Sequence, residues 1–225
     1  MKYYSYHSEA SETDGEVTVQ PAGPTARECG AQVVDRVFAS VRLRKTYHLI
    51  GGGTLAACSL ILDTAEFALL CLCWLALFGI ISKRLSTAAL GLLMLASLTG
   101  SKITTFGSAL VFVAGDGVAT LVGTALGKRK LPWHGEKSIA GSLSFFLAAS
   151  LTMMAALPVL LDRPPLHLLM LTVIPSLAGC LAEALPFTLV RDIRDGKPDD
   201  NLLILLSSGL TLHLLIKILG VGVIR

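Results

Sequence analysis

The residues best suited to chemistry are acidic side chains inside long apolar stretches. Asp116 ends the apolar run from Ala109 to Ala114, and Glu183 lies deep in a later apolar stretch. A carboxylate inside a bilayer costs about 2.5 to 3.5 kcal/mol on insertion scales, so a passive structural role for Asp116 is disfavoured. We therefore treat Asp116 and Glu183 as candidate catalytic or metal-binding residues.

A polar stripe and a basic cluster follow Asp116 along the chain. If this segment is a helix, Ser108, Thr120 and Thr124 share one face with Asp116, and the stripe runs toward Lys128–Lys130. A carboxylate that holds a divalent ion and lysines that neutralise phosphate would together suit a metal-bound polyphosphate. Two alternatives stay open: Lys128 and Lys130 as ordinary cytoplasmic anchors, and the glycines of this segment as a helix-packing stripe.

Further candidates lie where loops meet apolar segments. Lys137 and Ser138 precede one segment and offer a cation, a hydroxyl and free backbone N–H groups, which are the parts of an anion site. Ser138 could equally be a helix N-cap, and Asp200, with Asp199, could cap the last segment. Three residues head the first segment, as snorkelling anchors or as a basic wall for phosphate: Arg44, Lys45 and His48.

The elements that must position these residues are apolar helices. Of the 225 residues, 53% are hydrophobic and 16% are charged, and the charges fall mostly in short clusters between apolar runs. Candidate spans lie at about 47–63, 67–82, 86–100, 104–124, 139–161, 166–187 and 201–223. The predicted fold is all-α, a transmembrane bundle of about seven spans over 47–225. Residues 1–30 are predicted to be a disordered polar tail, and 31–46 an interfacial amphipathic helix.

The distribution of Lys and Arg predicts the orientation of the bundle. With seven spans, most basic residues collect on one side, so we expect an integral multi-pass protein with a cytoplasmic N-terminus and the site on the cytoplasmic face. A net charge of +3 without a basic stripe argues against nucleic acid as a partner. The cysteines and histidines do not show metal-ligand spacing, and we read the cysteines as small apolar side chains.

The segment from Gly115 to Ser142 resembles the core motif of the membrane-bound, CTP-dependent lipid kinases. That family comprises phytol and farnesol kinases, dolichol kinase and the CTP-using diacylglycerol kinase, within the cytidylyltransferase-like membrane superfamily. The residues that carry the central resemblance are Gly115-Asp116, Gly123, Gly127-Lys128, and Lys137-Ser138-Ile-Ala-Gly141. Similar flanking motifs are Arg44-Lys45-Thr-Tyr-His48, Glu183-Ala-Leu-Pro186 and Asp200-Asn201.

The resemblance implies transfer of the γ-phosphoryl group of CTP to the hydroxyl of a membrane lipid alcohol, a phytol, a polyprenol or diacylglycerol. It implies Mg²⁺ bound by Asp116, with Glu183 or Asp200 as a second ligand or as the catalytic base. The implied nucleotide-binding residues are Arg44, Lys45, His48, Lys128, Lys130, Lys137, Ser138 and Asn201.

Two other functions compete with this reading. A cytidylyltransferase that forms a CDP-lipid would use the same nucleotide and similar ligands, but its expected His-Gly-Gly signature is only partly echoed at His134-Gly135-Glu136. A membrane transporter would use Asp116 and Glu183 as an ion or proton relay. Inverted repeats would support the transporter reading, and the sequence shows no internal repeat.

Overall fold

The structure is a computed structural model that describes residues 46, 49–78, 83–186, 190–191 and 198–221. All of them belong to the unit Arg42–Arg225. The predicted polar tail and, apart from Thr46, the predicted interfacial helix lie outside the described residues, as do Arg44, Lys45 and His48.

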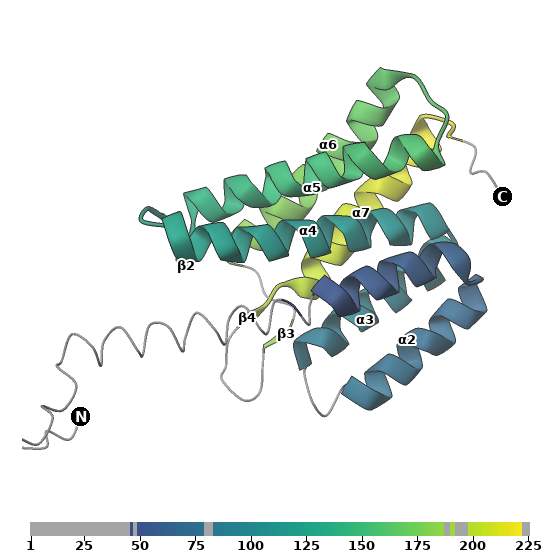
Figure 1. The fold of residues 1–225 in the computed structure, drawn as a ribbon, viewed down its shortest axis with the longest axis horizontal. Coiled ribbons are helices and arrows are strands. Elements are labelled where there is room, and N and C mark those ends of the chain that lie inside the picture. The colour runs from purple at the N-terminus through teal and green to yellow at the C-terminus, as the bar shows by residue number, and fades with distance from the viewer. Residues whose placement is uncertain (1–45, 47–48, 79–82, 187–189, 192–197, 222–225) are drawn as a thin grey trace, which may run out of the picture. The chain divides into compact units, whose positions relative to one another are not determined.

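Each predicted span is a helix in the structure (Figure 1). In chain order the described helices are Leu49–Ile61, α2 (Thr64–Phe78), α3 (Lys83–Thr99), α4 (Lys102–Leu126), α5 (Ile139–Leu160), α6 (Pro165–Ala184) and α7 (Asn201–Ile218). By length and composition, four of them could cross a membrane: α4, α5, α6 and α7. The other three are shorter apolar helices.

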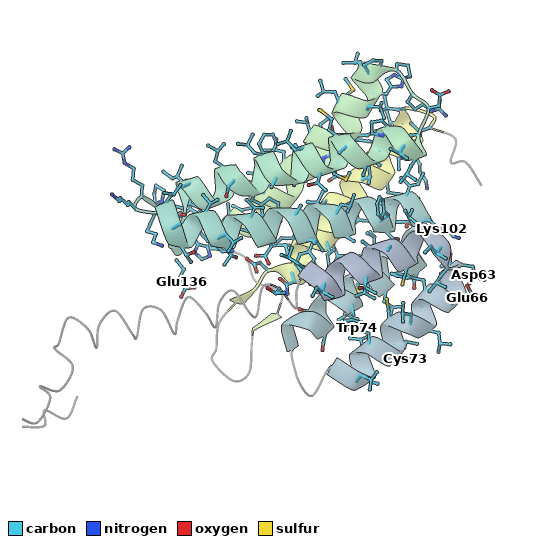
Figure 2. All side chains as sticks on the ribbon, in the orientation of Figure 1. Asp63, Glu66, Cys73, Trp74, Lys102 and Glu136 are labelled. Atoms are coloured by element: carbon cyan, nitrogen blue, oxygen red, sulfur yellow. The ribbon has the colours of Figure 1, made fainter. Side chains whose placement is uncertain are left out.

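The outer faces of the helices carry apolar side chains. Leu69, Leu147 and Leu151 are each at least half exposed, although they lie well inside their helices. Figure 2 shows charged side chains at the ends of the bundle, with Glu136 at one end and Asp63, Glu66 and Lys102 at the other. Apolar surface that surrounds a bundle between two charged ends fits lipid rather than water.

The core is centred on α4, which packs against α3, α5, α6 and α7. Phe112 of α4 and Phe145 of α5 are fully buried. A Cβ atom added to Gly115 would come within 2.6 Å of the Phe145 ring, so this position requires the missing side chain. The glycines of the Asp116 segment therefore pack helices, as one alternative above proposed.

Capping interactions fix where the helices begin. Asp63 and Glu66 form a reciprocal capping box, in which each side chain accepts a hydrogen bond from the other residue's backbone N–H, at 2.8 and 3.1 Å. Ser101 caps α4 by accepting from the Thr104 backbone N–H at 3.2 Å. Pro165 opens α6 at its first turn, where its missing N–H costs nothing.

The described chain is helical, as predicted, and two short antiparallel strand pairs accompany the helices. Strands β1 (Lys130–Leu131) and β2 (His134–Ser138) form a hairpin between α4 and α5. Strands β3 (Val190–Arg191) and β4 (Pro198–Asp199) pair between α6 and α7. Both pairs lie at the same end of the bundle, where α4 and α6 end and α5 and α7 begin (Figure 1).

Candidate functional site

One hydrogen bond ties the hairpin β1–β2 to α6, and two more hold the hairpin and its base together. The Trp133 indole N–H donates to the Ala184 carbonyl at 2.9 Å, which ties the turn to the last residue of α6. The Lys130 ammonium donates to the Glu136 carbonyl at 3.1 Å across the hairpin, and the Ile139 N–H donates to the Arg129 carbonyl at its base. These bonds fix the direction in which β2 carries Lys137.

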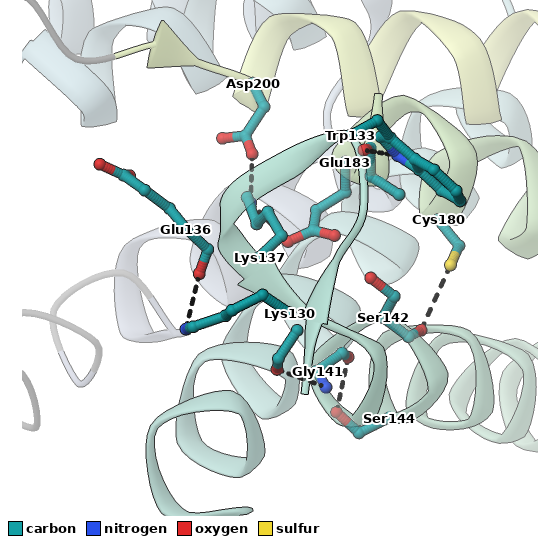
Figure 3. A network of polar contacts seen from close by, with 12 residues as sticks. Lys130, Trp133, Glu136, Lys137, Gly141, Ser142, Ser144, Cys180, Glu183 and Asp200 are labelled. Atoms are coloured by element: carbon teal, nitrogen blue, oxygen red, sulfur yellow. Dashed lines mark hydrogen bonds and ion pairs between the residues drawn. The ribbon is translucent and has the colours of Figure 1, made fainter. Parts of the chain in front are cut away.

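Lys137 joins two carboxylates that are distant in the sequence. Its ammonium donates to Asp200 Oδ2 at 2.6 Å and to Glu183 Oε1 (Figure 3). Exposed fractions are 25% for the Lys137 side chain, 5% for Glu183 and 23% for Asp200. The hairpin, the end of α6 and the start of α7 therefore meet at one largely buried ionic cluster, formed by Lys137, Glu183 and Asp200, which we call the Lys137 cluster.

The two carboxylates keep Lys137 charged. Burial alone would lower the pKa of the Lys137 ammonium, but the charges and hydrogen bonds of Asp200 and Glu183 outweigh burial and hold that pKa above its ordinary value. Lys137 is thus a permanent cation at neutral pH, placed where an anionic ligand could replace either carboxylate as its partner.

Glu183 retains one oxygen with no hydrogen-bond partner among the described residues. Its Oε2 atom is fully buried and unpaired, while Oε1 accepts from Lys137. Asp116 is also buried and lies close enough for its charge to act on Glu183. A buried carboxylate oxygen without a partner is costly, and such an atom is expected where a proton, a metal ion or a ligand hydroxyl is to be bound.

The residues fit a magnesium ion that is shared with phosphate, rather than one held by protein alone. Among the described residues, no group of three or more His, Cys, Asp or Glu side chains could hold a metal ion. Mg²⁺ commonly takes only one or two carboxylates and completes its shell with water and substrate phosphates. Asp116 and Glu183, each buried and each acidic, could supply that number of protein ligands.

Asp200 occupies the N-cap position of α7 but does not cap it. Its side chain makes no capping hydrogen bond, because its carboxylate points to Lys137 instead. The sequence allowed Asp200 to be a helix cap, but in the structure its side chain pairs with Lys137 instead. The next residue, Asn201, is buried and donates through its amide to the Thr87 hydroxyl at 3.4 Å, which links the start of α7 to α3.

Ser138 caps α5, as its simpler interpretation predicted. Its hydroxyl oxygen accepts from the Gly141 backbone N–H at 3.1 Å, and the side chain is buried. Glycines surround it: a Cβ at Gly127 would lie 2.5 Å from the Ser138 hydroxyl and 2.1 Å from the Gly123 carbonyl. The Gly-rich end of α4 and the Lys-Ser-x-x-Gly sequence thus pack closely together, and this contact positions the hairpin that carries Lys137.

Other predicted residues lie apart from the cluster. Lys128 and Lys130 are exposed near the base of the hairpin. The polar stripe divides: the Ser108 hydroxyl is buried against α7, where it donates to the Leu205 carbonyl at 2.7 Å, whereas Thr124 is exposed and bonds back to its own helix. The structure brings together Lys137, Glu183 and Asp200.

Sequence reasoning missed two contributors, Trp133 and Thr87. Trp133 stands 58% exposed yet anchors the hairpin to α6, and an aromatic residue between Pro132 and His134 in a short polar loop was the available signal. Thr87, which accepts from Asn201, had no local signal because its partner is distant in the sequence.

The comparisons with known proteins give one informative relative. The chain is 39% identical over 108 residues to the chloroplastic farnesol kinase of Arabidopsis thaliana, and this covers 45% of the chain and 32% of the farnesol kinase. The match therefore spans about a third of that protein's length. No family model matches the chain, and no solved structure matches it significantly.

Proposed function

We propose that this protein is a CTP-dependent kinase that phosphorylates the hydroxyl of a membrane lipid alcohol. The observation that carries the proposal is the Lys137 cluster with its unpaired Glu183 oxygen, at the charged end of an apolar helical bundle. The similarity to a farnesol kinase supports a lipid alcohol as the acceptor. The choice of CTP rests on the resemblance of the Gly115–Ser142 segment described above.

In the proposed reaction, the acceptor hydroxyl oxygen attacks the γ-phosphorus of CTP. The bond between that phosphorus and the β–γ bridging oxygen breaks, CDP leaves, and the hydroxyl proton passes to Glu183 Oε2. This oxygen suits the task because it is buried and accepts no hydrogen bond from any described residue. Lys137 would bind phosphate oxygens as charge shifts toward the leaving CDP.

Mg²⁺, when bound, would neutralise phosphate charge in the transition state. Asp116 and Glu183 would hold it, with Glu183 using the oxygen that does not take the acceptor proton. The exposed Lys128 and Lys130 would add positive charge for the nucleotide, and Ser138 and Asn201 would hold the backbone near the cluster. Arg44, Lys45 and His48 stay candidates for nucleotide binding on the motif resemblance alone. Because positioning and charge neutralisation dominate phosphoryl transfer, the protein needs few groups at the reacting atoms.

Phosphate binding would compete with the carboxylates for Lys137. In the structure the Lys137 ammonium donates to Glu183 and Asp200. A nucleotide phosphate that takes over this ammonium would free Glu183 Oε1 and Asp200 Oδ2 for metal or acceptor. The ion pairs observed here would then describe the enzyme before nucleotide binds.

The test uses purified protein in nanodiscs with Mg²⁺ and CTP labelled at the γ-phosphate, offered phytol, farnesol, a polyprenol and diacylglycerol in turn. The expected result is label in an organic-phase lipid monophosphate with the wild-type protein and at least about a hundredfold less with Asp116→Asn. Full activity of a normally inserted Asp116→Asn protein would overturn the role of Asp116. Absence of labelled lipid with every acceptor would overturn the kinase proposal itself.

A further inference from the structure

Two buried polar atoms near the Lys137 cluster have no hydrogen-bond partner among the described residues. One is Glu183 Oε2, and the other is the hydroxyl oxygen of Ser142, which lies near the start of α5. Hydroxyl groups inside helices usually donate to a carbonyl of the preceding turn. In this bundle Ser144 and Ser176 do so, each at 2.7 Å, whereas Ser142 makes no such bond to any described residue.

The Ser142 hydroxyl and the Glu183 carboxylate face each other where α5 contacts α6. Figure 3 shows the Ser142 side chain pointing toward Glu183. Cys180 lies beside both residues: its thiol donates to the Ser142 carbonyl at 3.2 Å, and Glu183, one turn further along α6, is close enough for its charge to act on that thiol. The two unpaired atoms are not bonded to each other, so a third oxygen between them could bond to both.

The chemistry of the two unpaired atoms selects a hydroxyl group as the third member. A carboxylate oxygen can only accept a hydrogen bond, whereas a serine hydroxyl can also donate one. An alcohol oxygen between them would donate its proton to Glu183 Oε2 and accept from the Ser142 hydroxyl. Its second lone pair would remain for attack on phosphorus. An anion such as phosphate would be repelled by the Glu183 carboxylate at the same position.

We infer that Ser142 binds the hydroxyl oxygen of the acceptor alcohol and holds it beside Glu183 Oε2. The inference rests on the proposed function for the reaction, and it adds a residue that recognises the acceptor. The nucleotide phosphates would bind at Lys137, which contacts the other oxygen of Glu183. The Glu183 carboxylate lies between Ser142 and Lys137 (Figure 3), so Ser142 is on the side of the alcohol and Lys137 on the side of the nucleotide.

The test compares Ser142→Ala with Ser150→Ala in nanodiscs with Mg²⁺, CTP and farnesol. Ser142→Ala removes the hydroxyl, so kcat/KM for farnesol should fall at least about tenfold, while the Kd for CTP, measured without acceptor, stays within about twofold of wild type. Ser150→Ala is the matched control and should change neither quantity. Ser150 also has a buried hydroxyl without a partner among the described residues, but it lies about 12 Å farther along α5.

Unchanged kcat/KM for farnesol in Ser142→Ala, an equal loss in Ser150→Ala, or an equal weakening of CTP binding would overturn the inference and leave the kinase proposal standing. If the wild-type protein phosphorylates no alcohol, the kinase proposal fails, and the site is tested by displaceable binding of tritiated farnesol without nucleotide. Binding that is weakened at least about fivefold in Ser142→Ala but not in Ser150→Ala would uphold an alcohol site. Equal binding by all three proteins, or no displaceable binding to the wild type, would overturn it.

Discussion

Lys137 brings together two carboxylates from helices that are distant in the sequence, and it determines the charge balance of the site. With Glu183 and Asp200 as partners, the cluster as drawn carries two negative charges against one positive charge. Asp116 adds a further acidic group nearby. Under the proposed function, this surplus of acid would favour a cation such as Mg²⁺, and Lys137 would bind phosphate.

Replacing Glu183 with Gln tests the proton acceptor. Glu183→Gln keeps the size of the side chain and an acceptor for Lys137, but it removes the basic oxygen. We expect kcat to fall by about 10² to 10⁴, the usual contribution of a general base, with little change in the thermal midpoint. Single-turnover kinetics and thermal unfolding in nanodiscs measure the two quantities. Activity within a factor of about three of wild type would contradict the assignment.

Replacing Lys137 tests both phosphate binding and stability. Lys137→Met should reduce kcat/KM for CTP by about 10² or more and lower stability by about 3 to 5 kcal/mol, because two carboxylates lose their partner. Lys102→Met, an exposed lysine at the other end of the bundle, is the control and should change neither quantity. Equal effects of the two substitutions would contradict a special role for Lys137.

The raised pKa of Lys137 predicts how this stability depends on pH. A cation whose folded-state pKa is raised contributes its stability below the ordinary lysine pKa of about 10.4 and loses it only as pH rises through the folded-state value. The difference in thermal midpoint between wild type and Lys137→Met should therefore be the same at about pH 7 and at about pH 9. A difference that shrinks markedly by pH 9 would show that Lys137 is not stabilised as a cation.

The hairpin β1–β2 holds Lys137 in place through its contacts with the neighbouring helices. The glycines at the end of α4 let Ser138 approach closely, and Trp133 ties the turn to α6. The hairpin therefore cannot shift without moving α4, α5 or α6. Gly123 and Gly127 therefore affect the site by allowing α4 to pack closely against Ser138.

Substitutions at Gly127, at the end of α4, and at Gly135, in the hairpin, test whether helix packing positions Lys137. Gly127→Ala would place a Cβ 2.1 Å from the Gly123 carbonyl, so the hairpin must move and activity should fall at least about tenfold. Gly135→Ala is the matched control, since no described atom lies within 4 Å of its added Cβ. Measuring kcat/KM for both variants decides the point, and an unimpaired Gly127→Ala enzyme would mean that hairpin placement is not critical.

The helices could be predicted from the sequence because apolar stretches and their polar boundaries are local signals. All seven predicted spans coincide with described helices. The hairpin could not be predicted, since Lys130 to Ser138 is too short for a strand pattern and is held by Trp133 bonding to Ala184. Lys137, Glu183 and Asp200 were each identified as candidates from the sequence, but the ion pairs that join them were not, because those contacts depend on how α6 and α7 pack.

The two ends of the helical bundle differ. The hairpin end carries the Lys137 cluster, and the described residues of the other end form no comparable cluster. The Lys137 cluster, Asp116 and the exposed Lys128–Lys130 segment lie toward the hairpin end, while Asp63, Glu66 and Lys102 lie at the other. The positive-inside rule predicts that the hairpin end faces the cytoplasm.

Thiol accessibility tests this orientation. In a variant without native cysteines, Glu136→Cys at the hairpin should react with a membrane-impermeant maleimide only after the cells are permeabilised, whereas Asp162→Cys between α5 and α6 should react in intact cells. The opposite pattern would place the site on the outer face and contradict the predicted topology.

The proposed reaction transfers the terminal phosphate of CTP to a lipid, and CTP that carries two labels distinguishes this reaction from nucleotidyl transfer. CTP labelled at both the α- and γ-phosphates would be incubated with the wild-type protein, Mg²⁺ and farnesol in nanodiscs. We expect γ-label in the lipid phase and α-label in soluble CDP. Label from the α-phosphate in the lipid, with release of γ-labelled pyrophosphate, or both labels remaining in CTP, would contradict it.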